Sequence, residues 1–173
     1  MSACDLGELY PEMRARVDEF LTHCQACRFD VLIYCAKRSL EDQARLFRNG
    51  RSIGLIWAKA DELSERFGRP DLSEILMNVG PQYGERIVTN AAPGQSTHNY
   101  GLAVDGVPMI GGKPLWTTDS HDDMQVWNQY GTMATGAGLE WAGHWTSFRE
   151  YPHLQLPGYD WRDLITGREQ WIR

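Results

Sequence analysis

Two short segments of the chain carry the residue types of a catalytic zinc site. The first places an imidazole at His98 and a carboxylate at Asp105, seven residues apart, and the second contains Glu150 and His153. Two histidines and one aspartate form a ligand set that holds zinc and leaves a fourth position for water. A nearby glutamate outside the ligand set can accept a proton from that water. The pattern predicts a zinc hydrolase in which Glu150 is the general base.

The expected local structure lets the first two ligands converge. A strand over residues 102–107 would alternate its side chains, so that Asp105 shares one face with the small residue Ala103. His98 would lie in the loop before this strand, and Gly101 would allow the backbone to turn between them. We therefore expect both side chains to enter one site.

The second segment is expected to begin another strand. Pro152 favours extended backbone at the residue before it, which places Glu150 and His153 at the mouth and the start of that strand. Two neutral imidazoles and one carboxylate leave a bound zinc ion with a net positive charge, and that charge favours ionisation of the water.

The two segments together form the pattern Ser96-x-His98-x-x-Gly101-x-Ala103-x-Asp105 and Glu150-x-x-His153. This pattern resembles the signature of the zinc D-alanyl-D-alanine carboxypeptidase and L-alanyl-D-glutamate peptidase family. The runs 88–105 and 138–145 are similar to its phage endolysin branch, and the resemblance extends from about Tyr34 to Gln155. It implies an α+β fold of the hedgehog/DD-peptidase type, with a small antiparallel sheet that carries the zinc site and helices packed around it.

The resemblance also implies an activity and a ligand set. The expected protein is a peptidoglycan peptidase, an endolysin that hydrolyses the L-Ala–D-Glu bond of the stem peptide with metal-activated water. One Zn²⁺ per chain would be held by His98, Asp105 and His153. The alternatives are a D-Ala-D-Ala carboxypeptidase or dipeptidase of the same family, and a zinc-containing binding module without catalysis. The presence of both Glu150 and Arg38 argues against the binding module.

Arg38 is expected to take part in catalysis. The run 38–47 resembles the same endolysin branch, which implies that Arg38 lies at the end of a strand and stabilises the oxyanion of the tetrahedral intermediate. A planar guanidinium supplies positive charge where negative charge develops. The alternative is a surface or helix-capping arginine.

Three further residues are assigned supporting roles. Ser96 is expected to orient a ligand through a hydrogen bond, because a zinc-bound hydroxide makes a serine nucleophile unnecessary. Tyr100 and Trp145 are candidates for the substrate groove, although aromatic residues in such a context are more often part of a core. Trp145 and Phe148 are expected to pack beneath the site.

Length and composition fit one domain over residues 1–173, without a separate cell-wall-binding domain and as a monomer. The hydrophobic content of 42% is enough for a core. A net charge of −6 argues against a nucleic-acid partner. The first residues lack the basic start and apolar run of a secretory signal, and no stretch is long enough to insert into a membrane. An endolysin of this kind would stay in the host cytoplasm until it is released to the cell wall.

Four cysteines in such a compartment are expected to be reduced thiols. Cys24 and Cys27 form a C-x-x-C, but no second pair follows at zinc-ribbon spacing, so both are expected to be small buried residues near a helix end.

Periodicity predicts the remaining elements. Ser39 is expected to cap a helix, in a weaker form because Asp42 replaces the glutamate or glutamine of a capping box. Other helices are expected over residues 11–27, 57–67, 72–77, 122–135 and 161–172. Strands are expected over residues 29–35, 86–89, 102–107 and 139–141, with a hairpin or loop at Gly111-Gly112.

Overall fold

The fold is described from a computed structural model, which covers residues 4–80 and 84–167. The chain divides into two compact units. The first comprises Met1–Lys37 and Gly101–Gly158, and the second comprises Arg38–Tyr100 and Tyr159–Arg173. Each unit is described on its own, and the single domain expected from the length stays a prediction.

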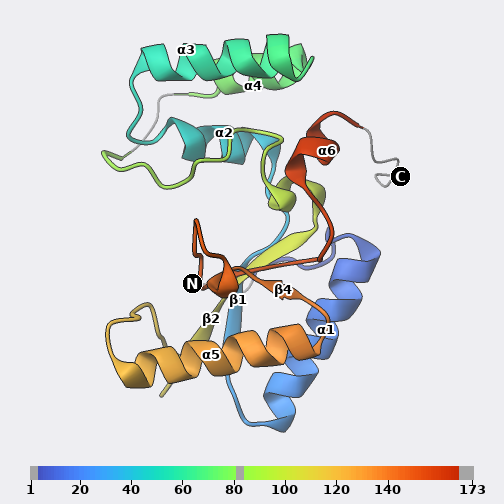
Figure 1. Cartoon of the computed structure of the whole chain (residues 1–173), viewed down its shortest axis with the longest axis vertical. Helices are drawn as coiled ribbons and strands as arrows, with labels where there is room; N and C mark the ends of the chain where they lie inside the picture. Colours follow the sequence, from blue (N-terminus) through green and yellow to red (C-terminus); the bar gives the residue numbers. More distant parts are fainter. Residues whose placement is uncertain (1–3, 81–83, 168–173) are drawn as a thin grey trace. The chain divides into compact units, whose positions relative to one another are not determined.

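The first unit is built on a small antiparallel sheet (Figure 1). Its strands are β1 (Val31–Cys35), β2 (Ala103–Ile110), β3 (Lys113–Pro114), β4 (Glu140–Trp141) and β5 (His153–Gln155). The order is β1-β2-β5-β4, and β3 pairs with the end of β2 as a hairpin. Gly111 and Gly112 turn that hairpin with φ values of 57° and 76°. The α+β class with a small antiparallel sheet is confirmed.

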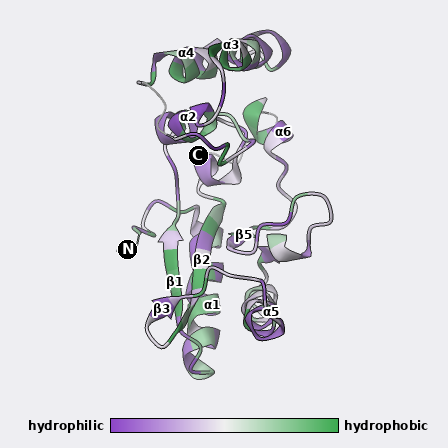
Figure 2. Ribbon diagram, turned by 90° about the vertical axis from the view of Figure 1, so that its left-hand side faces the viewer, coloured by the Kyte–Doolittle hydropathy of each residue, from purple (hydrophilic) through white to green (hydrophobic). Residues whose placement is uncertain are grey.

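Two helices, α1 (Pro11–Ala26) and α5 (His121–Gly136), complete the first unit together with a short turn, η3 (Ala142–His144). Phe20 of α1 meets Tyr130 of α5 edge to face, with ring centroids 5.4 Å apart. A Cβ at Gly131 would lie 2.0 Å from the indole of Trp141, so only glycine lets α5 approach this strand so closely. In Figure 2 β1 is coloured as hydrophobic along most of its length, and Ile33 at its centre is buried.

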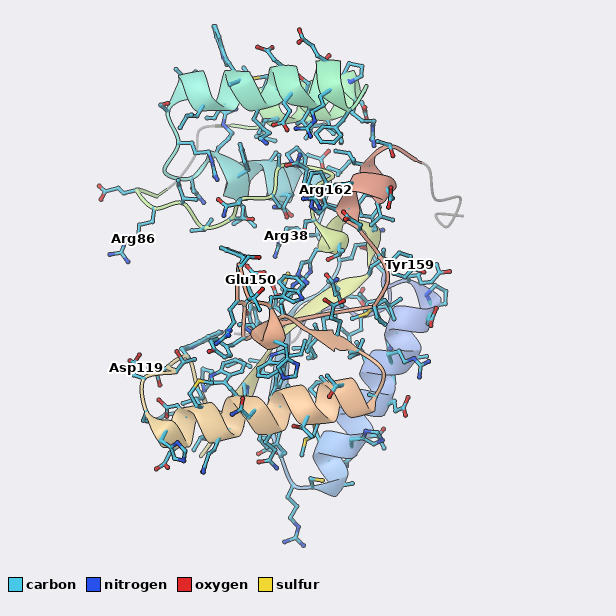
Figure 3. All side chains as sticks on the ribbon, viewed as in Figure 1. Arg38, Arg86, Asp119, Glu150, Tyr159 and Arg162 are labelled. Carbon is cyan, nitrogen blue, oxygen red and sulfur yellow. The ribbon has the colours of Figure 1, made fainter. Side chains whose placement is uncertain are left out.

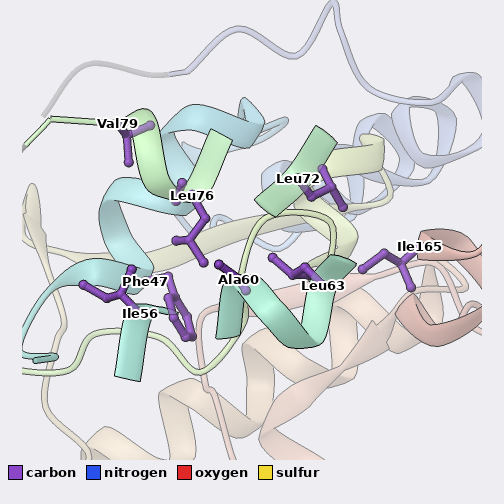
Figure 4. Close-up of a cluster of buried hydrophobic side chains, with 10 residues drawn as sticks. Phe47, Ile56, Ala60, Leu63, Leu72, Leu76, Val79 and Ile165 are labelled. Carbon is purple, nitrogen blue, oxygen red and sulfur yellow. The ribbon is translucent and has the colours of Figure 1, made fainter. Parts of the chain in front are cut away.

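The second unit is mainly helical. Its elements are α2 (Leu40–Arg48), α3 (Ile53–Asp61), the π-helical turn η1 (Glu62–Arg66), α4 (Pro70–Asn78), η2 (Thr97–Tyr100) and α6 (Trp161–Ile165). Helices α3 and α4 lie side by side (Figure 1). Figure 4 shows the cluster between the helices, in which Phe47, Ile56, Leu63, Leu72 and Leu76 are buried. Burial of each such side chain stabilises the unit by about 1.5–3 kcal/mol.

The predicted cap of α2 is confirmed in its weaker form. The Ser39 hydroxyl accepts a hydrogen bond from the Asp42 amide at 3.0 Å. The Asp42 carboxylate accepts from the Arg45 guanidinium at 2.7 Å, so it is engaged with the next turn of the helix. This arrangement starts α2 directly after Arg38.

Some sequence predictions need correction. The strand expected over residues 86–89 is wrong, because this segment is irregular and Ile87 and Val88 are more than half exposed. Arg51 donates to the Thr89 carbonyl at 2.7 Å, a side-chain bond in place of a strand ladder. Phe148 is 50% exposed and does not pack beneath a site. The helix expected over residues 161–172 ends at Ile165, and residues 168–172 lie outside the described part.

Two other expectations concern the state of the cysteines and the presence of membrane-spanning helices. All four cysteines are free thiols, and Cys24 is buried as expected while Cys27 is exposed, contrary to the prediction. Among the described residues, every helix is too short or too polar to cross a lipid bilayer.

Candidate active site

Three ligand-type side chains form a row across neighbouring strands of the first unit. In the antiparallel register Cys35 of β1 lies opposite Asp105 of β2, and Asp105 lies opposite His153 of β5. Directly opposed residues point to the same face of a sheet. The thiol of Cys35 and a carboxylate oxygen of Asp105 lie within 4.8 Å of each other. The sheet therefore brings a thiol, a carboxylate and an imidazole together from distant parts of the chain.

The imidazole of His153 makes a polar contact through each ring nitrogen. Its Nδ1 lies 3.2 Å from Oδ1 of Asp105, and its Nε2 lies 3.1 Å from Oε1 of Gln155. Gln155 donates through Nε2 to the carboxylate of Glu140 at 3.4 Å, and the indole of Trp145 donates to the same carboxylate at 2.6 Å. His153 and Gln155 are both 7% exposed, so the contact between them is shielded from water, while Glu140 and Trp145 are half-buried.

The direction of these hydrogen bonds follows from the chemistry of the groups. An ionised carboxylate only accepts, so Glu140 requires the Gln155 amide to turn its NH₂ group toward it and its Oε1 toward His153. Oε1 only accepts as well, and His153 must donate to it through Nε2–H. In the neutral ring Nδ1 then carries a lone pair, and that lone pair faces the carboxylate of Asp105.

Two acceptors that face each other in a buried position require a cation or a proton between them. Nitrogen and oxygen ligands about 2.0–2.1 Å from a tetrahedral zinc ion lie about 3.3 Å apart. The observed separation of 3.2 Å between Nδ1 and Oδ1 agrees with that value. Asp105 and His153 therefore fit two positions of a zinc ligand set.

Glu150 is held in a turn immediately before β5. Its amide donates to the Ala142 carbonyl at 3.3 Å, and its carbonyl accepts from the His153 amide at 3.3 Å. Figure 3 shows Glu150 on the segment between η3 and β5. The structure thus confirms the expected position of Glu150 at the mouth of the strand that His153 begins.

In the second unit Arg38 and His98 are joined through their backbones. The Arg38 amide donates to the His98 carbonyl at 3.0 Å, and Asn99 donates through its side chain to the Arg38 carbonyl at 3.1 Å. The Arg38 guanidinium donates to Oε1 of Gln43 at 2.8 Å, while Nε2 of Gln43 donates to the Ala91 carbonyl at 2.7 Å. Because Gln43 is fully buried, it fixes the direction of the guanidinium.

The loop that carries His98 is closed by its own hydrogen bonds. Gly94 donates to the Asn99 side chain at 2.9 Å, and the Tyr100 hydroxyl donates to the Gly94 carbonyl at 2.9 Å. Burial raises the pKa of Tyr100 to about 12, so its hydroxyl stays protonated and keeps this bond. The Ser96 carbonyl accepts from the Asn99 amide at 3.0 Å. Tyr100 and Asn99 therefore hold the His98 turn in shape.

After this turn Gly101 adopts φ 69°, as its predicted role requires. A Cβ there would approach the Glu8 carbonyl and the Tyr10 amide to 3.0 Å, so a side chain would be crowded as well as strained. The indole of Trp145, a second groove candidate, lies with its ring centroid 5.5 Å from that of His153. Trp145 therefore contacts the predicted ligand directly, within the first unit.

Several residues with clear contacts to the predicted site residues were not assigned roles from the sequence. Among them are Cys35, Gln43, Asn99, Glu140 and Gln155. Only Gln155 carried a local signal, because a residue two positions after His153 on a strand faces the same side. The others become visible only through strand pairing and loop contacts.

Known proteins support the resemblance drawn from the signature. Residues 89–156 match the family model described as D-alanyl-D-alanine carboxypeptidase. The chain is 26% identical over 154 residues to the peptidoglycan L-alanyl-D-glutamate endopeptidase CwlK of Bacillus subtilis (strain 168), covering 87% of this chain and 74% of that protein. The crystal structure of the Serratia marcescens L-Ala D-Glu endopeptidase ChiX matches with a TM-score of 0.47 and 19% identity, over 87% of this chain and 82% of that chain. The matched segment 89–156 contains His98, Asp105, Glu150 and His153, the residues of the signature.

Proposed function

We propose that the protein is a zinc-dependent peptidoglycan endopeptidase that hydrolyses the L-Ala–D-Glu bond of the stem peptide. The observation that carries the proposal is the 3.2 Å approach of His153 Nδ1 to Asp105 Oδ1 inside the family signature. The similarity to CwlK, whose name states this bond, supports the choice of substrate. Asp105 and His153 both lie within the segment 89–156 that the family model matches.

The proposal assigns metal binding and proton transfer to different residues of the site. His98, Asp105 and His153 would hold Zn²⁺, which supplies a Lewis acid and lowers the pKa of a bound water. Glu150 takes the proton of the attacking water and later gives it to the leaving amine of D-Glu. The attacked carbonyl carbon and the leaving nitrogen are bonded to each other, so one carboxylate can serve both steps.

Arg38 has a separate electrostatic role in the proposal. Its guanidinium stabilises the oxyanion that develops when the carbonyl of the scissile bond is attacked. The hydrogen bond to Gln43 supports this role, because a fixed donor needs no reorganisation during the reaction. The same arrangement explains why a flexible lysine would be a poor substitute.

The resemblance to the phage branch suggests a biological setting. We propose that the protein is an endolysin that acts as a monomer, remains in the host cytoplasm, and is released to the cell wall at lysis. A D-Ala-D-Ala carboxypeptidase is the second candidate, because the family model that matches carries this description. A non-catalytic zinc module is disfavoured by the fixed guanidinium of Arg38 and the turn that holds Glu150.

Product analysis distinguishes the two enzymes. The zinc-loaded protein is incubated with purified sacculi and with defined stem peptides, and the products are identified by mass spectrometry. An endopeptidase exposes a new D-Glu amine, whereas a carboxypeptidase releases terminal alanine. A chelator should stop the reaction, and added zinc should restore it. Intact sacculi and stem peptides after incubation with the zinc-loaded protein would refute both peptidase assignments.

The role of Glu150 is tested in the same assay. Glu150→Gln should bind zinc as the parent does and lose turnover by a factor of at least about 10². Glu12→Gln is the matched control, because Glu12 is an exposed acid on α1 of the same unit. Activity equal to that of the parent in Glu150→Gln would refute the assignment of Glu150 as the general base.

A further inference from the structure

A chain of hydrogen bonds runs from the half-buried Trp145 and Glu140 through the buried Gln155 to Nε2 of His153. We propose that Gln155 and Glu140 are positioning residues that fix the ring tautomer of His153, so that Nδ1 keeps its lone pair for the metal. This inference rests on the proposed zinc site and goes beyond it, because neither residue belongs to the ligand set or to the proton-transferring groups.

The first step is the orientation of the Gln155 amide. An amide can present either end to a neighbour, and the two ends have opposite hydrogen-bonding character. Glu140 removes the choice, because its carboxylate accepts the Gln155 NH₂ group at 3.4 Å. The indole N–H of Trp145 donates to the other oxygen of Glu140 at 2.6 Å and holds that carboxylate in place.

The second step is the position of the proton on the imidazole. With its amide oriented by Glu140, Gln155 presents Oε1 to Nε2 of His153 at 3.1 Å and requires a proton there. A neutral ring carries only one N–H, so Nδ1 is left as a lone pair. Nδ1 is the atom that lies 3.2 Å from the carboxylate of Asp105. The outer hydrogen bond therefore decides which nitrogen is ready to bind a metal.

The sheet register is what places these groups. Gln155 lies opposite Ala103 on one side and Glu140 on the other, and Ala103 is fully buried with only a methyl group. A small residue on β2 leaves room for the long amide on the same face. The chain of bonds thus crosses from β4 to β5 through directly paired residues.

Single substitutions should disturb the tautomer in defined ways. Gln155→Leu removes the acceptor for Nε2–H. In Glu140→Gln the new amide must accept from Trp145 through its oxygen, so its NH₂ group faces the NH₂ group of Gln155. Rotation of Gln155 relieves this conflict but turns a donor toward Nε2 and moves the ring proton to Nδ1. Loss of such a supporting contact weakens metal binding by about 10- to 100-fold.

Exchange of the two side chains should restore the site. In the double variant Glu140→Gln/Gln155→Glu, the glutamine accepts from Trp145 and donates to the new glutamate, which in turn accepts from Nε2–H of His153. Every bond of the parent is present with the same direction at His153. Gln155→Glu alone instead sets two carboxylates against each other. Both single variants should therefore bind zinc more weakly than either the parent or the double variant.

The test measures zinc binding by the full-length chain rather than activity. Zinc dissociation constants are determined by competition with a chromophoric chelator for the parent, Gln155→Leu, Glu140→Gln, Gln155→Glu and the double variant. Gln25→Leu is the matched control, because Gln25 is exposed on α1 of the same unit. Long-range ¹H–¹⁵N spectra of the zinc-loaded parent should show the His153 proton on Nε2. Urea unfolding of the metal-free variants separates a loss of affinity from a loss of folding.

The outcomes separate the two proposals. If the parent binds no zinc, both the proposed function and this inference are refuted. If the parent binds zinc but Gln155→Leu binds as tightly, or His153 carries its proton on Nδ1, only the inference is overturned. A purely structural role for the pair would lower folding stability in the single variants without the recovery of zinc affinity in the double variant.

Discussion

Gly94 offers a prediction that can be worked from the structure in detail. It precedes the His98 turn, adopts φ 80°, and forms hydrogen bonds with the side chains of Asn99 and Tyr100. A Cβ at this position would lie 2.5 Å from Cδ1 of Leu72 and 3.3 Å from Cγ1 of Ile165. Both neighbours belong to the fully buried core of the second unit. Alanine at position 94 would therefore be strained and crowded at once.

The two effects have separable magnitudes. A non-glycine residue in the left-handed region costs about 1–2 kcal/mol. Overpacking a filled core costs typically about 1–3 kcal/mol more. Gly94→Ala should thus lower the free energy of unfolding by about 2–5 kcal/mol, a large share of the roughly 5–15 kcal/mol that stabilises a protein of this kind. It should also weaken zinc binding, because the displaced turn carries His98.

Urea unfolding of Gly94→Ala, Gly68→Ala, Leu72→Ala and the double variant Leu72→Ala/Gly94→Ala tests this reasoning. Gly68→Ala is the matched control in the same unit, because Gly68 has φ 65° and a Cβ there would meet nothing within 4 Å. It should show only the backbone effect, about 1–2 kcal/mol. Leu72→Ala removes the nearest atom that the new Cβ would meet and leaves only the looser contact with Ile165, so in that background Gly94→Ala should cost less than it does in the parent. Equal costs for Gly94→Ala and Gly68→Ala in the parent would refute the argument.

Three further outcomes are expected. Removal of zinc by a chelator should lower the midpoint temperature of unfolding, measured by calorimetry, by about 5–11 °C. The reference is protein with free zinc at 100 times its dissociation constant, where binding contributes about 2.7 kcal/mol. An unchanged midpoint temperature would argue against a bound metal. Arg38→Lys should lower kcat by about 10²- to 10³-fold with little change in KM, because it removes the guanidinium that Gln43 aligns; steady-state kinetics on a stem peptide would show this, and a change confined to KM would contradict it. Burial raises the pKa of Cys24 to about 12, so its thiolate is scarce at pH 8. Mass spectrometry after iodoacetamide treatment should therefore find the exposed Cys27 alkylated and Cys24 unmodified. Rapid alkylation of Cys24 in the folded protein would show that Cys24 is not buried.

Local sequence signals predicted the elements that depend on neighbours along the chain. The amphipathic spacing and Pro11 placed α1, and Ser39 placed the start of α2, because periodicity and capping act within a few residues. The position of Glu150 at the mouth of the strand that begins at His153 was also predicted from neighbouring residues, because Pro152 favours extended backbone at the residue before it. The strand predicted over residues 86–89 was wrong, because β-branched residues favour a strand only where a partner strand supplies the hydrogen bonds.

The partners of the site residues could not be predicted in this way. Asp105 and His153 are 48 positions apart, and only the register of β2 and β5 shows that they lie opposite each other. Gln43 and Glu140 read as an ordinary helix residue and an ordinary strand residue. Their roles depend on which end of an amide or which oxygen meets which neighbour, and this is decided by tertiary packing.

Strand β5 shows how the site and the core constrain each other. Its first and last residues, His153 and Gln155, face the side that carries Asp105. Leu154 between them is fully buried and lies opposite Val104 and Trp141. A slip of one residue in the pairing would exchange the two faces and place the polar pair in the core. The burial of Leu154 therefore holds the same register that orients His153 toward Asp105. Packing on one face of the strand and the approach of His153 to Asp105 on the other depend on the same register, so a substitution on either face would disturb both.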